Sequence, residues 1–357
     1  MRDDRALTTG LIYHPDYAKH SLGPAHPERP ERITGTIQYL SEVGLLEDPD
    51  VHLFKPEPAT VEELRLVHTI QYIERIRRLS GRGGMLTLDT PVPPSTYDIA
   101  RLSAGGAMLA GGVVAEGKVK NSFALIRPPG HHAGRDFGGG FCYFNNIALM
   151  VEHLRTRYRM KRFMIIDWDV HHGNGTQNIF YSDPTVLYFS THQMPLYPGT
   201  GTIDEIGEGE GEGYNVNLPL PPGTSGEVYR EIVKELIEPL ADEFKPEIIA
   251  VSAGQDAYFA DPIANLHFSV DEYFCITKLV MRIADRHCSG RLAMALEGGY
   301  NLEALPRIIA GILVAQSGLN LKIFEPRTTP EQKENQAIKE RIMQVKAALS
   351  EYWKAFR

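Results

Sequence analysis

The sequence predicts an α/β fold in which a mostly parallel sheet is flanked by helices. Four short runs are apolar along nearly their whole length, which is typical of parallel strands buried on both faces. These runs lie at 122–126, 162–166, 247–251 and 292–296. Helical spacing is found at 61–79, 225–244 and 269–287. Parallel neighbours need crossover connections, so this mixture of patterns indicates the α/β class.

Length and composition predict one domain over residues 1–357. The 357 residues are 43% hydrophobic, enough to bury a large core. We expect a C-terminal extension at about 330–357, in which 331–356 forms a charged amphipathic helix. That helix either packs on the domain or mediates oligomerisation. The longest apolar stretch, 104–115, is too short and too rich in glycine to span a membrane, and it predicts a packed helix.

The charge and the cysteine content indicate which binding partners and which cellular compartment to expect. With 37 basic and 45 acidic residues the net charge is −8, which argues against non-specific nucleic-acid binding and is compatible with a cationic substrate. The acidic stretch 204–213 predicts a flexible, solvated loop. The three cysteines have no paired spacing, and residues 1–4 carry no targeting signal, so we expect a reducing, cytoplasmic location.

Residues that bind metals follow the run at 162–166. Alternate residues of an extended segment point the same way, so Asp169 and His171 can converge on one ion while Asp167 faces elsewhere. Asp256, just after the run at 247–251, offers a third ligand. One imidazole and two carboxylates leave a zinc-sized ion with an open position, which indicates a catalytic site. A calcium loop fits poorly, because its glycine and glutamate are missing.

Reactive side chains also follow the other two runs. After 122–126 the chain is broken by a Pro-Pro-Gly segment and continues with His131 and His132. After 292–296 a flexible Gly-Gly pair precedes the phenol of Tyr300. Ligands of open α/β sheets bind outside the carboxyl ends of the strands. Reactive groups after four separate strands therefore predict one site at that edge.

Longer motifs around these residues resemble the histone deacetylase family, which includes acetylpolyamine amidohydrolases and acetoin-utilization proteins. The similarity runs from about 13 to 313 and is closest to the class II-like prokaryotic members. It rests on 26–32 (HPERPER), 127–132 (RPPGHH), 138–146 (GGGFCYFNN), 167–175 (DWDVHHGNG) and 296–300 (LEGGY). The resemblance implies an arginase/deacetylase-like three-layer α/β fold. It also implies zinc-dependent hydrolysis of an acyl amide, with zinc held by Asp169, His171 and Asp256.

The resemblance also pairs each histidine with a partner. His131 would bond Asp167, whose charge favours the imidazolium, whereas His132 would face the uncharged Asn174. His132 is then the better general base, and His131 an electrostatic stabiliser. Tyr300 would donate to the developing oxyanion.

Further residues are expected around the substrate. The Gly140 carbonyl would accept the substrate amide N–H. Phe141, Tyr197 and Ile263 would line a narrow tunnel suited to an aliphatic linker, and Asp89 matches a rim aspartate that accepts hydrogen bonds from the substrate backbone. Family members often have Phe-Asp-Ala-His and Asp-Pro-Leu-Gly where this chain has 255–258 (QDAY) and 261–264 (DPIA). We expect these departures to alter the pocket wall.

Two monovalent-cation sites, for K⁺ or Na⁺, are implied as well. The first would lie near Asp167, Asp169, His171, Ser190 and Thr191. The second would lie near Phe180, Asp183, Val186 and Tyr214. Their ligands would largely be backbone carbonyls, which a sequence does not specify.

The predicted function is zinc-dependent deacetylation of an acetylated primary amine, with acetyl-lysine of a peptide or protein as the favoured substrate. Acetylpolyamine hydrolysis is the alternative within the same class. A deacetylase-like binding module without turnover is disfavoured, because the reactive set is intact. An arginase-type ureohydrolase would need a two-metal cluster, which calls for more carboxylate ligands than these strand ends offer.

Overall fold

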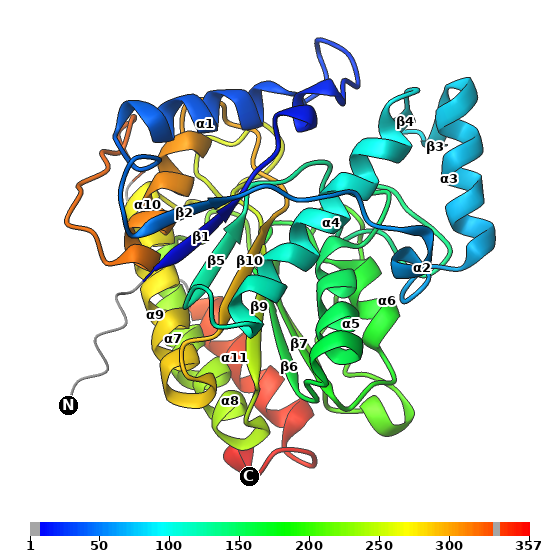
Figure 1. Cartoon of the computed structure of the whole chain (residues 1–357). Coiled ribbons are helices and arrows are strands. Elements are labelled where there is room, and N and C mark those ends of the chain that lie inside the picture. Colours follow the sequence, from blue (N-terminus) through cyan, green and yellow to red (C-terminus); the bar gives the residue numbers. More distant parts are fainter. Residues whose placement is uncertain (1–7, 331–335) are drawn as a thin grey trace.

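The computed structural model describes residues 8–330 and 336–357 and contains an eight-stranded sheet with helices on both faces (Figure 1). All strand pairings within this sheet are parallel. In spatial order the strands are β2 (Val51–Phe54), β1 (Thr9–Ile12), β5 (Asn121–Ala124), β10 (Leu292–Leu296), β9 (Ile248–Ala253), β6 (Phe163–Asp167), β7 (Val186–Gln193) and β8 (Asn215–Leu220). The predicted α/β class and parallel sheet are confirmed.

The four strands predicted from apolar runs are neighbours at the centre of the sheet. They are β5, β10, β9 and β6, and every residue in them is buried. Burial on both faces explains why these runs are continuously apolar instead of alternating. Their carboxyl ends lie together at one edge of the sheet, and the chain leaves each strand there with polar residues.

Helices cover both faces of the sheet. Figure 1 shows α4 (Thr96–Ala115) and α5 (Asn146–Tyr158) on one side, and α9 (Val270–Cys288) and α10 (Leu305–Ser317) on the other. The remaining helices are α1 (Glu31–Glu42), α2 (Val61–Leu64), α3 (Ile70–Arg82), α6 (Asn174–Phe180), α7 (Tyr229–Ile232), α8 (Glu238–Phe244) and α11 (Gln336–Leu349). A short antiparallel hairpin, β3 (Gly84–Thr87) and β4 (Thr90–Val92), stands apart from the main sheet.

Two of the predicted helices agree with the structure. α9 begins after Ser269, which forms a capping box with Glu272, as expected for 269–287. The stretch 229–244 is helical throughout, with a π-helical turn at Val233–Ile237 between α7 and α8. The packed helix expected at 104–115 is the second half of α4, which is almost entirely buried. None of the helices in the described ranges is long and apolar enough to cross a membrane.

The helix predicted at 61–79 is wrong, because the chain forms two helices there. α2 ends at Leu64, and α3 begins after Thr69, whose side chain accepts the backbone N–H of Tyr72. Between them the His68 ring is buried and its Nδ1 lies 2.8 Å from the carbonyl oxygen of Gly134. This tertiary contact and the new N-cap interrupt a pattern that looks continuous in the sequence.

The C-terminal helix ends earlier than predicted. Residues 331–335 lie outside the described ranges, as do residues 1–4, for which no targeting signal was expected. α11 ends at Leu349, beyond which the indole of Trp353 donates to the carbonyl of Gly213 (2.7 Å). The helix buries Ile338, Ile342, Val345 and Leu349 and contacts β8. α11 therefore packs on the domain, which is one of the two roles that the sequence left open.

Candidate active site

Asp169, His171 and Asp256 converge at the carboxyl ends of β6 and β9. Their potential ligand atoms lie within 4.8 Å of one another, and all three residues are buried. His171 Nδ1 is 3.1 Å from Asp169 Oδ1 and 3.2 Å from Asp256 Oδ2. Asp167 faces away, toward His131 and the Tyr188 hydroxyl. The geometry thus brings together the three predicted ligands and separates Asp167 from them, as the alternation predicted.

The chemistry of this group fits a divalent cation. Among the described residues, Asp256 Oδ2 is buried and accepts no hydrogen bond, although the His171 ring nitrogen lies 3.2 Å away. Burial and the neighbouring Asp169 charge raise the pKa of Asp256, so the two carboxylates repel each other here. A Cβ at position 298 would collide with both carboxylates, which explains the glycine beside them. Two carboxylates and one imidazole form a donor set suited to zinc with an open coordination position.

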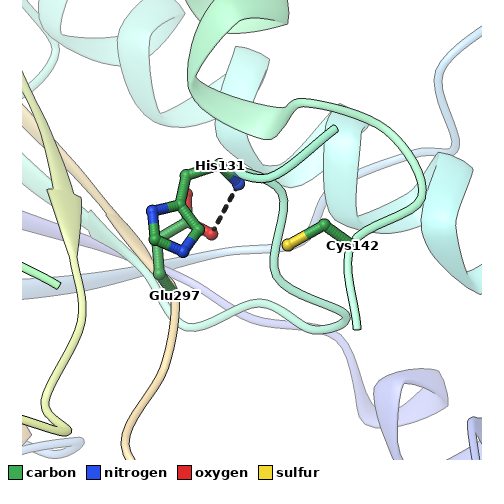
Figure 2. A group of neighbouring side chains, drawn as sticks. All are labelled: His131, Cys142 and Glu297. Atoms are coloured by element: carbon green, nitrogen blue, oxygen red, sulfur yellow. Dashed lines mark hydrogen bonds between the residues drawn. The ribbon is translucent and has the colours of Figure 1, made fainter. Parts of the chain in front are cut away.

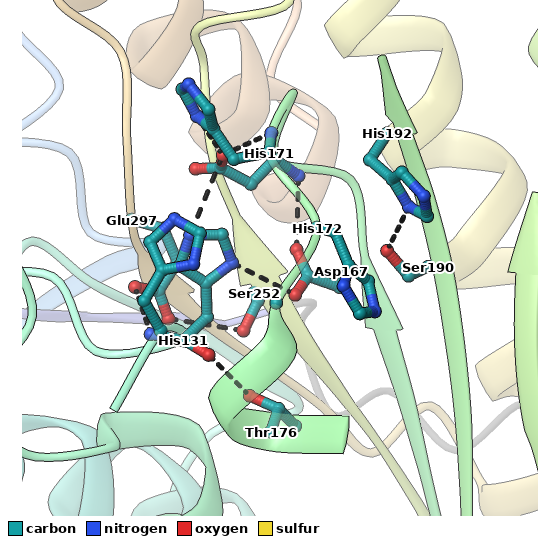
Figure 3. Close-up of polar contacts among 12 residues, drawn as sticks. His131, Asp167, His171, His172, Thr176, Ser190, His192, Ser252 and Glu297 are labelled. Carbon is teal, nitrogen blue, oxygen red and sulfur yellow. Dashed lines mark hydrogen bonds and ion pairs between the residues drawn. The ribbon is translucent and has the colours of Figure 1, made fainter. Parts of the chain in front are cut away.

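The two histidines of the 127–132 loop have different partners. His131 Nδ1 is 3.1 Å from Asp167 Oδ2, and His132 Nδ1 is 2.8 Å from Asn174 Oδ1 (Figure 3 shows the His131 contacts). Burial lowers the pKa of His131, but the charges of Asp169 and Asp167 outweigh this effect and raise it to about 10. Burial, then the positive charges of His131 and His171, hold the pKa of His132 well below its usual value. At neutral pH one ring is a cation and the other a free base.

Tyr300 is fixed by contacts that sequence reasoning missed. Its backbone N–H donates to Asp261 Oδ2 (2.7 Å), a carboxyl whose pKa is raised to about 7 by burial and by Asp256. The Arg32 guanidinium lies 4.8 Å from the centre of the Tyr300 ring and donates to the carbonyl of Gly299 (2.7 Å). Gly299 has a φ of 114°, which favours glycine. The Gly-Gly pair that we expected to be a flexible hinge is therefore held from several sides.

A cavity of about 270 Å³ leads from the surface to these groups. Its lining includes all five predicted substrate-binding residues: Asp89, Gly140, Phe141, Tyr197 and Ile263. Pro129, Leu196 and Gly298 also line it, which we did not predict. The catalytic candidates His131, His132 and Tyr300 and the candidate metal ligand His171 line it as well.

The walls of this cavity are aromatic. The Tyr197 ring is 5.0 Å from the His132 ring, and the Phe141 ring is 5.9 Å from the Tyr300 ring. Phe141 has a φ of 67°, an unusual conformation for an aromatic residue, and its N–H donates to the Thr90 hydroxyl (3.0 Å). Backbone strain of this kind is found mostly at functional sites.

Both departures were expected to alter the pocket wall, and for 255–258 this expectation is wrong. Gln255 and Tyr258 are each 1% exposed and are absent from the cavity lining. Gln255 donates to the carbonyl of Ala253, and the Tyr258 hydroxyl donates to Glu325. Both side chains turn into the protein interior behind the metal ligand. Of the departures from the family pattern, Ile263 is the one that meets the cavity.

The residues of the first predicted cation site lie close to the candidate metal ligands. Asp167 ends β6 and pairs with Ser190 of β7, and Thr191 follows on that strand. This site stays a prediction.

Of the residues of the second predicted cation site, Phe180, Asp183 and Val186 lie in the turn between α6 and β7, and Tyr214 precedes β8. The carbonyls of Phe180, Asp183 and Tyr214 accept the N–H groups of Asp183, Val186 and Tyr188. The Asp183 carboxylate is bonded by Thr185 and Arg155, and is therefore not free for an ion. This site also stays a prediction.

His131, Cys142 and Glu297 form a second buried group close to the site (Figure 2). Cys142 is unpaired, as are Cys275 and Cys288, and burial raises the pKa of the Cys142 thiol well above its usual value. A neutral thiol is a poor metal ligand. Its Sγ is 3.4 Å from the Gly140 carbonyl, which it meets as a weak donor. Cys142 is thus a small buried thiol.

The predicted acidic loop at 204–213 is more ordered than a solvated loop. Glu205 Oε1 accepts the N–H groups of Gly201 and Thr202, and Oε2 accepts from Gln177 (2.5 Å). Glu208, Glu210 and Glu212 are exposed, as expected. The loop is thereby joined to α6 through Glu205.

Fold and site together define a class: a parallel α/β protein with a candidate metal-ligand group, a pair of buried histidines and a tyrosine at the carboxyl ends of its strands. Comparisons with known proteins agree. The "Histone deacetylase domain" family profile matches residues 26–315. A "Probable deacetylase" of Archaeoglobus fulgidus is 46% identical over 98% of this chain and 100% of its own length.

Two further comparisons cover most of the chain. The "Histone deacetylase-like amidohydrolase" of Pseudomonas aeruginosa is 38% identical over 84% of this chain and 79% of its own length. The crystal structure of the HDA15 HD domain superposes with a TM-score of 0.88 at 31% identity, covering 98% of this chain and 97% of that one. The chain belongs to the histone deacetylase family, as its motifs predicted. This membership establishes deacetylase or amidohydrolase activity, which is hydrolysis.

Proposed function

We propose that this chain is a zinc-dependent amidohydrolase that removes the acetyl group from acetyl-lysine in peptides or proteins. One observation carries the proposal: the metal-ligand group, the free base His132 and the phenol of Tyr300 all meet at the inner end of one narrow cavity. A cavity with aromatic walls suits a long aliphatic side chain that carries its reactive amide at the tip.

Asp169, His171 and Asp256 would hold the zinc ion. When bound, zinc polarises the acyl carbonyl and lowers the pKa of a coordinated water. The donor set and the orphaned oxygen of Asp256 support this assignment.

His132 would take the proton of the attacking water and later deliver it to the leaving amine. Its lowered pKa keeps the ring neutral and able to accept that proton. His131, with its pKa raised to about 10, stays protonated and stabilises negative charge. The Tyr300 hydroxyl would donate to the oxyanion that develops on the acyl carbonyl oxygen.

The cavity walls support a peptide substrate. The carbonyl of Gly140 would accept the amide N–H of the acetylated side chain, while Phe141 and Tyr197 would flank its methylene groups. Asp89 at the mouth would accept N–H groups of the peptide backbone. Ile263 offers no charge for the distal ammonium of a polyamine, and an unpaired buried cation is costly.

Two further expectations belong to this proposal. We propose a cytoplasmic location, because the three cysteines are unpaired. We also propose that K⁺ or Na⁺ binds near the carboxyl ends of β6 and β7.

The test is a substrate comparison on the purified, zinc-loaded chain. We expect kcat/KM for acetyl-lysine peptides to exceed that for acetylspermidine and acetylputrescine, and removal of zinc by a chelator to abolish turnover. A preference of tenfold or more for the acetylated polyamines would favour the alternative substrate. No turnover of any acetylated amine would leave only a binding module.

A further inference from the structure

Glu297 occupies a central place that the mechanism above does not use. It is the first residue after β10 and is fully buried. Its Oε2 accepts the backbone N–H groups of Gly130 (2.6 Å) and His131 (3.2 Å), and its Oε1 accepts the hydroxyl of Ser252 (3.2 Å) (Figures 2 and 3). One carboxylate thus joins the loop that carries both histidines to the ends of β10 and β9.

The main chain around Glu297 holds the other half of the site. Arg32 donates to the carbonyls of Glu297 (2.5 Å) and Gly299 (2.7 Å), and Gly298 N–H donates to Asp169 Oδ2 (2.8 Å). Tyr300 follows directly. Residues 297–300 therefore contact a metal ligand and carry the oxyanion donor, while the Glu297 side chain reaches the histidines.

We propose that Glu297 is a positioning residue that fixes the separation between the histidine pair and Tyr300. The inference rests on the proposed function only in that both groups act in one turnover. Glu297 Oε2 accepts the backbone N–H of His131, the residue directly before His132. Without that acceptor, two buried N–H groups would lose their partner and the loop would relax toward another one. Small displacements of reacting groups cost much of the rate.

The same carboxylate could instead bind a second metal with His131 and Cys142, whose ligand atoms lie close enough. The contacts oppose this. Both Glu297 oxygens already accept hydrogen bonds, and burial raises the pKa of the carboxyl to about 7. A carboxyl that protonates this readily is a weak ligand beside a neutral thiol.

Substituting Glu297 with glutamine or with aspartate separates the effect of the position of its oxygens from the effect of its charge. Glu297→Gln keeps an acceptor oxygen at the same reach and can still meet the Ser252 hydroxyl, but it carries no charge. Glu297→Asp keeps the charge and withdraws the oxygens by one methylene. If position matters, the glutamine variant should be the more active one. If charge matters, the aspartate variant should be.

The control is Gln316→Leu, which removes a buried polar side chain near the amino end of β5, away from the site. Gln316 is fully buried and donates to the carbonyl of Ser122 in β5. This variant tests whether loss of a buried hydrogen bond alone lowers activity. Its kcat should equal that of the wild type below its melting temperature.

The experiment measures kcat, KM, melting temperature and zinc per chain for the wild type and the three variants. The substrate is whichever acetylated amine the wild type turns over fastest, so an error in substrate class does not affect the comparison. We expect Glu297→Asp to lower kcat by roughly 10²-fold, as misplacement of reacting groups does. KM should stay within about threefold, because the cavity walls are untouched.

The proposal requires that the two Glu297 variants differ in kcat. We expect Glu297→Gln to keep at least tenfold more kcat than Glu297→Asp, with one zinc per chain in both. Equal or higher activity in the aspartate variant would overturn the positioning role. So would a second zinc per chain in the wild type that both Glu297 variants lose.

Discussion

At the scale of the residue, the role of the Tyr300 hydroxyl can be tested by removing a single oxygen atom. The ring is held by Arg32 and Phe141, and its backbone by Asp261, so Tyr300→Phe should leave its position unchanged. Removing one oxyanion donor should lower kcat by roughly 10²–10³-fold with little change in KM. Steady-state kinetics on an acetyl-lysine peptide checks this. An unchanged kcat would remove Tyr300 from the mechanism.

A change beside His132 gives the pH dependence. Asn174 Oδ1 is 2.8 Å from His132 Nδ1, and the pKa of His132 lies well below its usual value. Asn174→Asp would put a negative charge there and raise that pKa. The base then loses its proton at higher pH, so the rising limb of the kcat/KM profile should move upward. His132→Ala should lower kcat by roughly 10²–10⁴-fold. A limb that stays in place in the aspartate variant would argue against His132 as the base.

The third residue-scale prediction concerns metal retention. Asp256→Ala removes one of two carboxylate ligands, and we expect it to abolish turnover and to lower zinc per chain. Asp204→Ala, an exposed carboxylate outside the cavity lining, is the matched control and should keep both. Metal analysis after dialysis, with far-UV circular dichroism to verify folding, measures the effect. Full zinc content and activity in the Asp256 variant would show that the ligand is misassigned.

At the scale of the element, the strand ends were the most predictable part of the chain. Apolar runs followed by reactive residues located β5, β6, β9 and β10 to within two residues. Because parallel strands have their carboxyl ends at one edge, the meeting of His131, Asp169, Asp256 and Tyr300 followed from the class of fold. The local sequence carries this information, because the apolar composition of each strand predicts that the strand is buried.

What the sequence did not predict depends on contacts between distant segments and on side-chain direction. The break at His68 needs the Gly134 carbonyl, the left-handed Phe141 needs Thr90, and the inward-turned Gln255 donates to the Ala253 carbonyl. The partners lie 66, 51 and two residues away along the chain. Even the nearest one is a matter of side-chain direction, which residue type does not determine.

The β3–β4 hairpin is the element that bears on substrate choice. Asp89 lies in its turn, where the hydroxyls of Thr87 (2.5 Å) and Thr90 (2.9 Å) both donate to Oδ1. If the carboxylate accepts peptide N–H groups, Asp89→Ala should lower kcat/KM for acetyl-lysine peptides by roughly tenfold, the scale of one hydrogen bond to a charged group. Acetylputrescine has no peptide backbone and should be affected less.

Asp89→Asn is the control for the turn itself. The amide oxygen can still accept both threonine hydroxyls, so the hairpin keeps its shape while the charge is lost. Its kcat/KM for the peptide should fall between those of the wild type and the alanine variant. Equal losses for peptide and acetylputrescine in Asp89→Ala would show that the residue supports the hairpin without contacting the substrate.

At the scale of the whole molecule, a buried ion cluster joins segments that are far apart in the chain. Glu28 bonds Arg127 through both carboxylate oxygens (2.7 Å each) and Arg32 through one (3.2 Å), and all three side chains are fully buried. Arg127 donates to the carbonyls of Tyr17 and His20, and Arg32 reaches residues 297 and 299. The N-terminal segment is thereby fastened to the loops of β5 and β10 that carry the catalytic candidates.

This cluster should make stability depend on pH in a defined direction. Burial raises the pKa of Glu28, but the charges of Arg127 and Arg32 and the hydrogen bonds from His20 and Arg127 together outweigh it and hold the pKa well below its usual range. A carboxyl with a depressed folded-state pKa stabilises the protein above its unfolded-state pKa of about 4.3, and that stabilisation is lost as the pH falls toward the folded-state value. Glu28→Gln should therefore cost roughly 3–5 kcal/mol near pH 7, because two buried guanidinium groups lose their counter-charge.

The measurement is urea unfolding of the wild type and Glu28→Gln from pH 7 down to pH 3, with zinc removed from both. The other carboxylates titrate in both proteins and cancel in the difference between the two unfolding free energies. That difference should be constant above about pH 5 and should shrink as the pH falls below about 4.3, where only the wild type loses the contribution of Glu28. A difference that stays the same across the whole range would mean that Glu28 stabilises the fold by its shape and hydrogen bonds, independently of its charge.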